Sequence, residues 1–468
     1  MHRDYVLTIN GQGRSTDDAV EIRNPADGSL VGLAPSGSSS DVDDAIAAAA
    51  EAYKTWRNSD NEARKQVCAT IAQVLQDNMG ELTELLTREQ GKPLKGFGSE
   101  FEVGGAIAWA QYTAAQELPV EVLEEDAEKC IELHRVPLGV VASITPWNYP
   151  LMIAIWHIVP ALRAGNTVVM KPSPYTPLTT LRMVELVNEK IPAGLLNIVS
   201  GGDGLGAQLS QDDRVKKVVF TGSTRTGKRI MAEAAASLKA LTLELGGNDA
   251  CIVLPGENIE PYAEGLFWGA MMNSGQTCGA IKRLYVHSDD YDRACEVLSS
   301  FAGQIPMGDG MNSENLLGPI QNEKQFNYVS ELVSDAKANG ARVLIGGEAS
   351  GDGYFFPVTL VADISDGTRL VDEEQFGPVL PIIRYRSLED AIARANNTAY
   401  GLNASVWGKD AELASRVAGQ LEAGTIFINK PPQLAPNVPF GGVKDSGVGV
   451  EFGEEGLKAF TDIKVISR

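Results

Sequence analysis

Residues 217–228 read KVVFTGSTRTGK, and this stretch decides the class of fold. The β-branched run at 217–221 predicts a strand, and the residues from 225 onward predict a helix. A glycine-rich turn between a strand and a helix presents free backbone N–H groups and the positive end of the helix dipole to a phosphate. The stretch therefore predicts a strand–turn–helix unit whose turn can bind phosphate.

The spacing of this turn separates it from two common phosphate-binding loops. Gly222, Gly227 and Lys228 nearly match the P-loop, but Arg229 replaces the hydroxyl residue that would hold Mg²⁺. A P-loop NTPase is therefore disfavoured. The turn also lacks the GxGxxG spacing of the usual dinucleotide fingerprint. By itself the segment fits an ordinary strand–helix turn equally well.

The rest of the chain repeats the same alternation. Segments 41–56 and 62–88 have helical apolar spacing, and helices are expected at 178–190 and 225–237. Short β-branched runs lie between the later helices, which favours an α/β protein with parallel sheets covered on both faces. The predicted strands are 140–145, 167–171, 196–200, 217–221, 250–254, 283–287, 343–345, 380–385, 404–406 and 425–429.

Composition restricts the function. The 468 residues suggest two to four domains at roughly 100–200 residues each. A net charge of −21 argues against nucleic acid and anionic membranes as partners. Segment 151–164 is too short and too interrupted to cross a bilayer, and the N-terminus lacks the apolar core of a signal peptide. Five cysteines and four histidines show neither a disulfide framework nor metal-ligand spacing, so we expect no metal and a reducing, cytoplasmic location.

Three residues could carry chemistry. Cys278 stands among small residues in NSGQTCGA, which leaves its sulfur approachable as a nucleophile. Glu244 ends an apolar run in LTLELGGND and could be a general base. Asn148, fixed between prolines in TPWNYP, could donate its amide to an oxyanion. Taken singly, each also fits a plain structural role: a small buried thiol, a strand-end carboxylate facing solvent and a simple turn.

Together the motifs resemble the NAD(P)-dependent aldehyde dehydrogenase superfamily over nearly the whole chain. Seven of them occur in the order of that family, and the interval of 278 − 244 = 34 residues between Glu244 and Cys278 also agrees. The motifs are TPWNYP (145–150), KPS (171–173), FTGSTxxGK (220–228), LELGG (243–247), GQTC (275–278), EEQFGPV (373–379) and PFGGVKxSGxG (439–449).

This resemblance implies a fold of three parts. A Rossmann-like cofactor domain would comprise 1–118 and 138–246, and a catalytic α/β domain would comprise 247–445. The charged segment 119–137, which reads as an antiparallel excursion, would form a small oligomerisation arm together with the C-terminal residues 446–468. A homodimer or homotetramer is the implied assembly.

The resemblance also implies a mechanism with NAD or NADP as the cofactor. Cys278 would attack the aldehyde, and the Asn148 side chain and the Cys278 backbone N–H would hold the oxyanion. Hydride transfer would leave a thioester, which a water activated by Glu244 would hydrolyse. A role for Glu451 in proton relay stays open. The residues implied in cofactor binding are Thr145, Trp147, Lys171, Gly222, Ser223, Gly227, Leu245, Glu374 and Phe376.

At two positions the sequence departs from the pattern of that family, and this leaves the choice between NAD and NADP open. Pro174 occupies the position where many members carry an acidic residue that binds the adenosine ribose and repels a 2′-phosphate. Arg225 lies in the phosphate turn and could meet such a phosphate.

The substrate pocket is implied by motif offset. Its residues are apolar or aromatic, and the loop 431–438 has no Arg or Lys, which favours an uncharged aliphatic or aromatic aldehyde. A semialdehyde or CoA-acylating dehydrogenase is the alternative within the superfamily, and a catalytically silent binding homologue is the alternative from another class. The implied pocket residues are Tyr149, Met152, Trp156, Met272 and Leu434.

Overall fold

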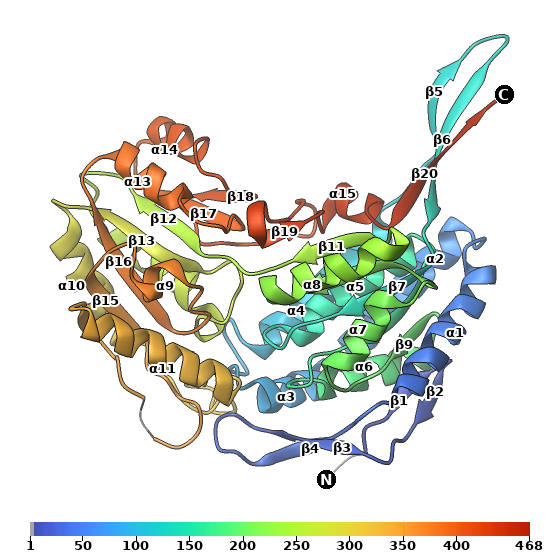
Figure 1. Ribbon diagram of the computed structural model, residues 1–468, viewed down its shortest axis with the longest axis horizontal. Coiled ribbons are helices and arrows are strands. Elements are labelled where there is room, and N and C mark those ends of the chain that lie inside the picture. Colours follow the sequence, from blue (N-terminus) through green and yellow to red (C-terminus); the bar gives the residue numbers. More distant parts are fainter. Residues whose placement is uncertain (1–3, 350) are drawn as a thin grey trace.

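A computed structural model describes residues 4–349 and 351–468. Its two lobes are each built on a large sheet, and a narrow arm projects from one of them (Figure 1). The lobe built mainly from the N-terminal half lies to the right in the view, and the lobe built from the later residues lies to the left. The α/β class predicted from the alternation is confirmed.

The first sheet has the strand order β19-β11-β10-β7-β8-β9-β1-β2. Its central strands are parallel, and β19 and β1 join antiparallel at either side. Gly447–Val448, which the sequence-based division groups with the arm, form β19 in this sheet. The strands are β1 (Leu7–Ile9), β2 (Gln12–Arg14), β7 (Val140–Ile144), β8 (Thr167–Lys171), β9 (Leu196–Ile198), β10 (Val215–Thr221), β11 (Ala240–Glu244) and β19.

Both faces of the first sheet are apolar because alternate side chains of each strand enter different cores. Val141 packs into one cluster with α4 and α5, whereas Val140 and Ala142 pack into another with α1. The helices of this lobe are α1 (Ser39–Trp56), α2 (Asn61–Asp77), α3 (Met79–Gln90), α4 (Ser99–Ala115), α5 (Pro150–Arg163), α6 (Leu178–Asn188), α7 (Asp203–Gln211), α8 (Thr224–Ala234) and α15 (Gly453–Lys458).

The single helix expected over 62–88 is wrong. Asn78 ends α2 and begins α3 with φ −112° and ψ 16°, and its side-chain amide donates to the carbonyl of Val74 at 2.8 Å. An asparagine that bonds the preceding turn competes with the continuing helix, so the chain bends there.

The second sheet has the order β14-β15-β16-β13-β12-β17-β18, parallel except for β14. Its strands are β12 (Asp249–Val253), β13 (Ile281–His287), β14 (Arg342–Ile345), β15 (Thr359–Ile364), β16 (Val379–Tyr385), β17 (Asn403–Trp407) and β18 (Thr425–Ile428). Its helices are α9 (Ala263–Met271), α10 (Tyr291–Ala302), α11 (Glu323–Ala338), α12 (Arg369–Asp372), α13 (Leu388–Asn396) and α14 (Ala411–Ala418).

Two smaller sheets complete the molecule. β5 (Glu121–Glu125), β6 (Cys130–Pro137) and β20 (Thr461–Ser467) form the antiparallel arm that carries the C-terminus (Figure 1). β3 (Ala19–Arg23) and β4 (Leu30–Pro35) form a hairpin.

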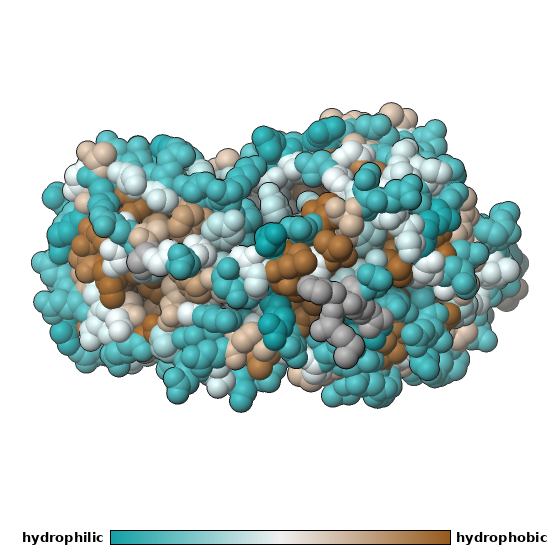
Figure 2. Space-filling model, turned by 90° about the horizontal axis from the view of Figure 1, so that it is seen from below, coloured by the Kyte–Doolittle hydropathy of each residue, from teal (hydrophilic) through white to brown (hydrophobic). Residues whose placement is uncertain are grey.

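The face seen from below is mainly hydrophilic, with a few hydrophobic patches (Figure 2). Within the described ranges, every helix falls short of the length and apolarity that crossing a membrane requires.

Candidate active site

Four neighbouring strands of the first sheet end at the same edge. The register pairs Ile144 with Lys171 and Thr221 with Glu244, so β7, β8, β10 and β11 finish level with one another. Because the carboxyl ends of parallel strands form the usual crevice of such a sheet, the residues that follow them gather there. This edge carries Thr145, Lys171, Gly222 and Leu245, four of the predicted cofactor residues.

The phosphate turn is built as the sequence predicted. Ser223 caps α8, its hydroxyl accepting from the N–H of Thr226 at 3.4 Å. A Cβ at Gly227 would lie 2.4 Å from a methyl of Leu245, so a larger residue there would displace the Leu245 side chain. An open cleft of about 1000 Å³ beside the turn is lined by Ser223 and Arg225 and by residues of α11. The turn therefore presents N–H groups and Arg225 to this cleft, whose α11 side carries both Lys324 and the acidic Glu323 and Glu331.

Lys171 is buried at the end of β8. Its ammonium donates to the carbonyl of Pro172 at 3.1 Å, and burial lowers its pKa to about 8, with Asp203 acting in the opposite direction. The Thr145 hydroxyl is also buried and has no partner among the described residues. Both groups are thus available to polar atoms of a ligand at this edge.

The loop before Cys278 is tightly constrained. Asn273, Ser274 and Gly275 all have positive φ, and a Cβ at Gly275 would lie 2.0 Å from the carbonyl oxygen of Gly377. Cys278 follows, half-buried against the core of the first lobe. Burial raises the pKa of its thiol to about 12, so Cys278 carries its proton until a base removes it.

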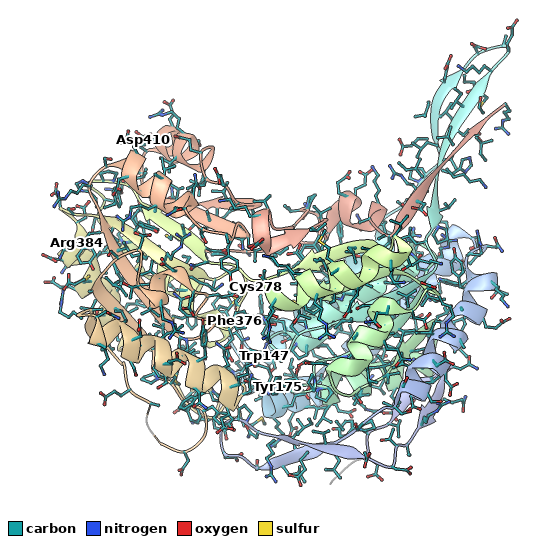
Figure 3. All side chains as sticks on the ribbon, in the orientation of Figure 1. Trp147, Tyr175, Cys278, Phe376, Arg384 and Asp410 are labelled. Carbon is teal, nitrogen blue, oxygen red and sulfur yellow. The ribbon has the colours of Figure 1, made fainter. Side chains whose placement is uncertain are left out.

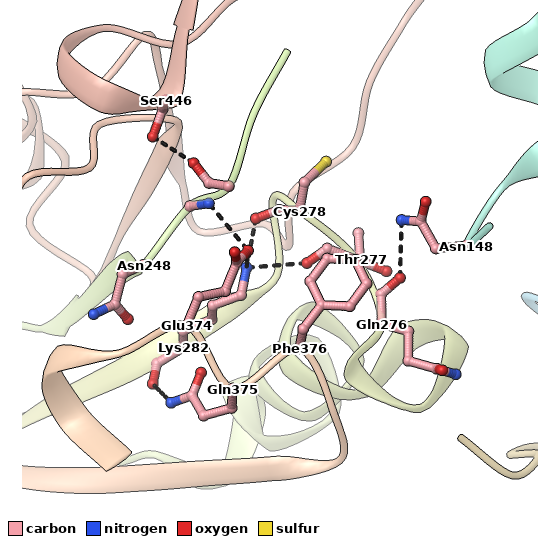
Figure 4. A network of polar contacts seen from close by, with 12 residues as sticks. Asn148, Asn248, Gln276, Thr277, Cys278, Lys282, Glu374, Gln375, Phe376 and Ser446 are labelled. Atoms are coloured by element: carbon pink, nitrogen blue, oxygen red, sulfur yellow. Dashed lines mark hydrogen bonds and ion pairs between the residues drawn. The ribbon is translucent and has the colours of Figure 1, made fainter. Parts of the chain in front are cut away.

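Asn148 ties this loop to the first sheet. Its side-chain amide donates to the carbonyl of Gln276 at 3.0 Å (Figure 4). The Asn273 amide donates back to the carbonyl of Asn148 at 3.1 Å. The hydroxyls of Tyr149 and Thr277 are 3.2 Å apart. The Asn148 amide therefore lies beside the backbone that leads into Cys278, with a second N–H left to donate.

Glu244 is fully buried at the end of β11. Neither carboxylate oxygen makes a well-formed hydrogen bond with the described residues, although the N–H of Gly442 lies close enough to favour the ionised form. Burial, reinforced by the charge of Glu451, raises the pKa of Glu244 well above its ordinary range. A raised pKa makes the ionised carboxylate a stronger proton acceptor, which is what a general base requires.

A buried polar cluster surrounds Glu451. Its Oε1 lies 3.3 Å from Nε2 of His157, whose ring also contacts the hydroxyls of Ser143 at 3.0 Å and Thr221 at 3.1 Å. The ammonium of Lys217 donates to Thr242 at 2.7 Å, and burial lowers its pKa to about 8. Glu451 and Glu244 interact electrostatically, so the two carboxylates share one charge environment.

Glu374 and Phe376 reach this region from the second lobe. The N–H of Gly247 donates to Glu374 Oε1 at 3.1 Å, and the rings of Phe376 and Trp147 meet edge to face with centroids 5.3 Å apart. Cys278, Phe376 and Trp147 lie one after another between the lobes (Figure 3). These side chains thus join the nucleophile candidate to the strand-end crevice.

Four of the predicted pocket residues share a core cluster with Cys278, and the fifth, Met272, begins the segment that precedes it. Tyr149, Met152 and Trp156 belong to the core cluster against which Cys278 and Leu434 also pack. The Met272 carbonyl accepts from the Thr277 hydroxyl at 3.2 Å. Their role in contacting substrate stays a prediction.

Sequence reasoning missed a buried ion pair behind Asn148. The side chains of Lys92 and Glu102 are both 0% exposed and 2.5 Å apart. Lys92 also donates to the carbonyl of Asn148 at 2.7 Å, and Glu102 accepts from the N–H groups of Leu151 and Met152 at the start of α5. The sequence shows two ordinary charges ten residues apart, and only the folded chain brings them together.

Lys92→Met should destabilise the protein strongly. Removing one partner of a buried ion pair leaves the other charge uncompensated, and we expect a loss of about 3–5 kcal/mol in the free energy of unfolding. Urea unfolding followed by tryptophan fluorescence measures it. Arg88→Met, which breaks the exposed pair with Glu84, is the control and should cost less than about 0.5 kcal/mol. An equal loss of unfolding free energy in Lys92→Met and Arg88→Met would contradict a stabilising role for the buried Lys92–Glu102 pair.

Comparison with known proteins agrees with this architecture. The aldehyde dehydrogenase family profile matches residues 12–466. Phenylacetaldehyde dehydrogenase of Pseudomonas fluorescens is 37% identical over 98% of this chain and 94% of its own. Betaine aldehyde dehydrogenase of Staphylococcus aureus, solved with NAD⁺, superposes with a TM-score of 0.96 at 32% identity and covers 100% of this chain and 95% of its own. An NADP-dependent enzyme of E. coli superposes with a TM-score of 0.96 at 34% identity and covers 99% of this chain and 98% of its own.

The fold and these relatives define a two-lobed α/β enzyme. The chain belongs to the aldehyde dehydrogenase family.

Proposed function

We propose that this chain oxidises an uncharged aldehyde to the carboxylic acid with NAD or NADP, through a thioester on Cys278. The observation that carries the proposal is the convergence of Cys278, the Asn148 amide and the buried Glu244 carboxylate at one crevice. The three groups supply a nucleophile, an oxyanion donor and a base, which acyl chemistry on an aldehyde needs.

In the first half of the reaction Cys278 attacks the carbonyl carbon. Because burial holds the thiol protonated, the attack proceeds from the thiolate fraction, after the proton has passed to solvent. The oxyanion receives the free N–H of Asn148 and the Cys278 backbone N–H. A nicotinamide cofactor held at this site would supply the oxidation, because it would accept hydride from the carbon. Cys278 is then left as a thioester.

In the second half Glu244 acts on water. As a buried carboxylate with a raised pKa it removes a proton from a water molecule, which attacks the thioester and releases the acid. Glu451 borders Glu244 and can influence how its proton leaves, but its role stays open.

Support for the cofactor comes from the strand-end crevice. Lys171 and the unpartnered hydroxyl of Thr145 fit a polar ligand, and the Ser223 turn fits a pyrophosphate. Trp147, Gly222, Gly227, Leu245, Glu374 and Phe376 complete the proposed set. Pro174 in place of an acidic residue and Arg225 in the cleft allow a 2′-phosphate, so both NAD and NADP are proposed.

The apolar surroundings of Cys278 favour an uncharged aliphatic or aromatic aldehyde. A semialdehyde dehydrogenase is the alternative in substrate class. A CoA-acylating enzyme is the alternative in the second step, and the buried base at Glu244 favours water over CoA.

We also propose a homodimer or homotetramer assembled through the arm. Val122, Leu123, Ile463 and Val465 of β5 and β20 are exposed by more than half their surface, which a second copy could cover. All five cysteines lie within the described residues as free thiols, which fits the predicted reducing, cytoplasmic compartment.

An aldehyde panel tests the proposal. Aliphatic, aromatic and carboxylate-bearing aldehydes are offered with NAD and with NADP, and reduced cofactor is followed by absorbance. We expect turnover of the uncharged aldehydes without CoA. Activity that requires CoA would overturn the hydrolytic step, preference for semialdehydes would overturn the substrate class, and silence across the panel would overturn the proposed activity.

A further inference from the structure

Lys282 is a buried lysine directly behind the nucleophile loop. It lies on β13, four residues after Cys278, and is only 2% exposed. None of the motifs that characterise the sequence includes it. A buried ammonium costs free energy unless its surroundings compensate it, so its contacts call for an explanation.

The contacts of Lys282 are all with the site. Its ammonium donates to the carbonyl of Cys278 at 2.5 Å and to that of Thr277 at 3.0 Å, and it lies 3.4 Å from Oε1 of Glu374 (Figure 4). The backbone on its own side is held as well, because the Gln375 amide donates to the Lys282 carbonyl at 2.9 Å. The Lys282 ammonium thus links the backbone of Cys278 to the side chain of Glu374, which is proposed to hold the cofactor.

The charges around Cys278 give this cation a specific importance. Glu244, Asp249 and Glu374 are the negative groups that oppose the thiolate, whereas Lys282 is the positive group that favours it. The largest charge contributions to this balance come from these four side chains, in contrast to the Cys–His arrangement that activates other thiols. A positive charge beside the residue that bears a thiol favours its thiolate, and here the ammonium contacts the Cys278 carbonyl.

We propose that Lys282 is a positioning residue that supplies the positive charge for the Cys278 thiolate while its two carbonyl contacts fix the loop. The inference rests on the proposed function only in taking Cys278 as the nucleophile. The same ammonium also faces Glu374 and Asp249, so its charge is shared between the thiolate and these carboxylates.

Alkylation of Cys278 tests this without cofactor or substrate. The rate of modification by iodoacetamide is measured by mass spectrometry of the Cys278 peptide between pH 7 and 10. Since only the thiolate reacts, Lys282→Gln and Lys282→Met should slow alkylation at pH 8 by about tenfold or more and displace the rate profile to higher pH. Lys282→Arg keeps the charge and should stay within about threefold of the unmodified protein.

Lys282→Gln keeps the proposal testable if Lys282→Met fails to fold, because its amide can still donate to the carbonyls. Lys239→Met is the matched control: Lys239 is also buried and donates to two carbonyls, of Asp212 at 2.7 Å and Val215 at 3.1 Å, but lies outside the site. The rate at which Cys278 is alkylated should be the same in Lys239→Met as in the unmodified protein.

An unchanged alkylation rate in folded Lys282→Gln, or equal slowing in Lys239→Met, would overturn the role of Lys282. Failure of the proposed function shows itself differently, as a Cys278→Ala variant that still oxidises aldehydes. The two failures are therefore distinguishable.

Discussion

Cys278→Ala should lose at least about 10⁴-fold in turnover, with no burst of reduced cofactor. The reason is that hydride leaves only from a tetrahedral adduct with an oxyanion, and without the thiol no residue at the crevice forms that adduct. Asn148 and the loop around it remain in place because Cys278 contributes a small, half-buried side chain. Stopped-flow absorbance at saturating aldehyde and cofactor measures both phases.

Cys130→Ala is the matched control, since Cys130 has the same partial exposure but lies on β6 of the arm. Its turnover should stay within about twofold. Substantial turnover in Cys278→Ala would mean that another nucleophile, or direct attack by water, carries the reaction.

The strands of the two large sheets could be predicted because their apolar runs are continuous. Strands buried on both faces, such as Thr167–Lys171, favour a nearly continuous run of apolar and β-branched residues, and TVVMK keeps this pattern up to its final lysine. β15 was not predicted, since Asp363 interrupts its apolar run and takes a positive φ where the register shifts. The N-terminal strands β1 to β4 are short edge and hairpin strands with weak patterns.

The site residues could be predicted where a strand end fixes their position. Lys171, Gly222 and Glu244 follow predicted strands or strand-like runs, and the parallel register places them at one edge. Lys92 and Lys282 could not be found in this way. A lysine in sequence reads as a solvated charge, and only tertiary contacts with Glu102 or with the carbonyl of Cys278 make it buried.

Glu244→Gln should separate the two halves of the reaction. The amide is nearly isosteric and cannot accept a proton from water, so thioester hydrolysis should slow by about 10²–10⁴-fold. Hydride transfer depends on Cys278 and Asn148 and should slow much less. The expected record is a burst of reduced cofactor, close to one per active site, followed by a steady rate that is nearly flat.

The pH dependence gives the same variant a second readout. Glu244 acts as a base only when ionised, and its pKa is raised, so steady turnover of the unmodified enzyme should fall as the pH drops through that raised pKa. Glu244→Gln should lose this acidic limb because glutamine does not titrate. Glu233→Gln, in α8 where the partly buried Glu233 pairs with the exposed Arg229, is the control and should keep both the rate and the limb. If burst and steady rate fell together in Glu244→Gln, the carboxylate would be needed to remove the thiol proton first, and its proposed place in thioester hydrolysis would be wrong.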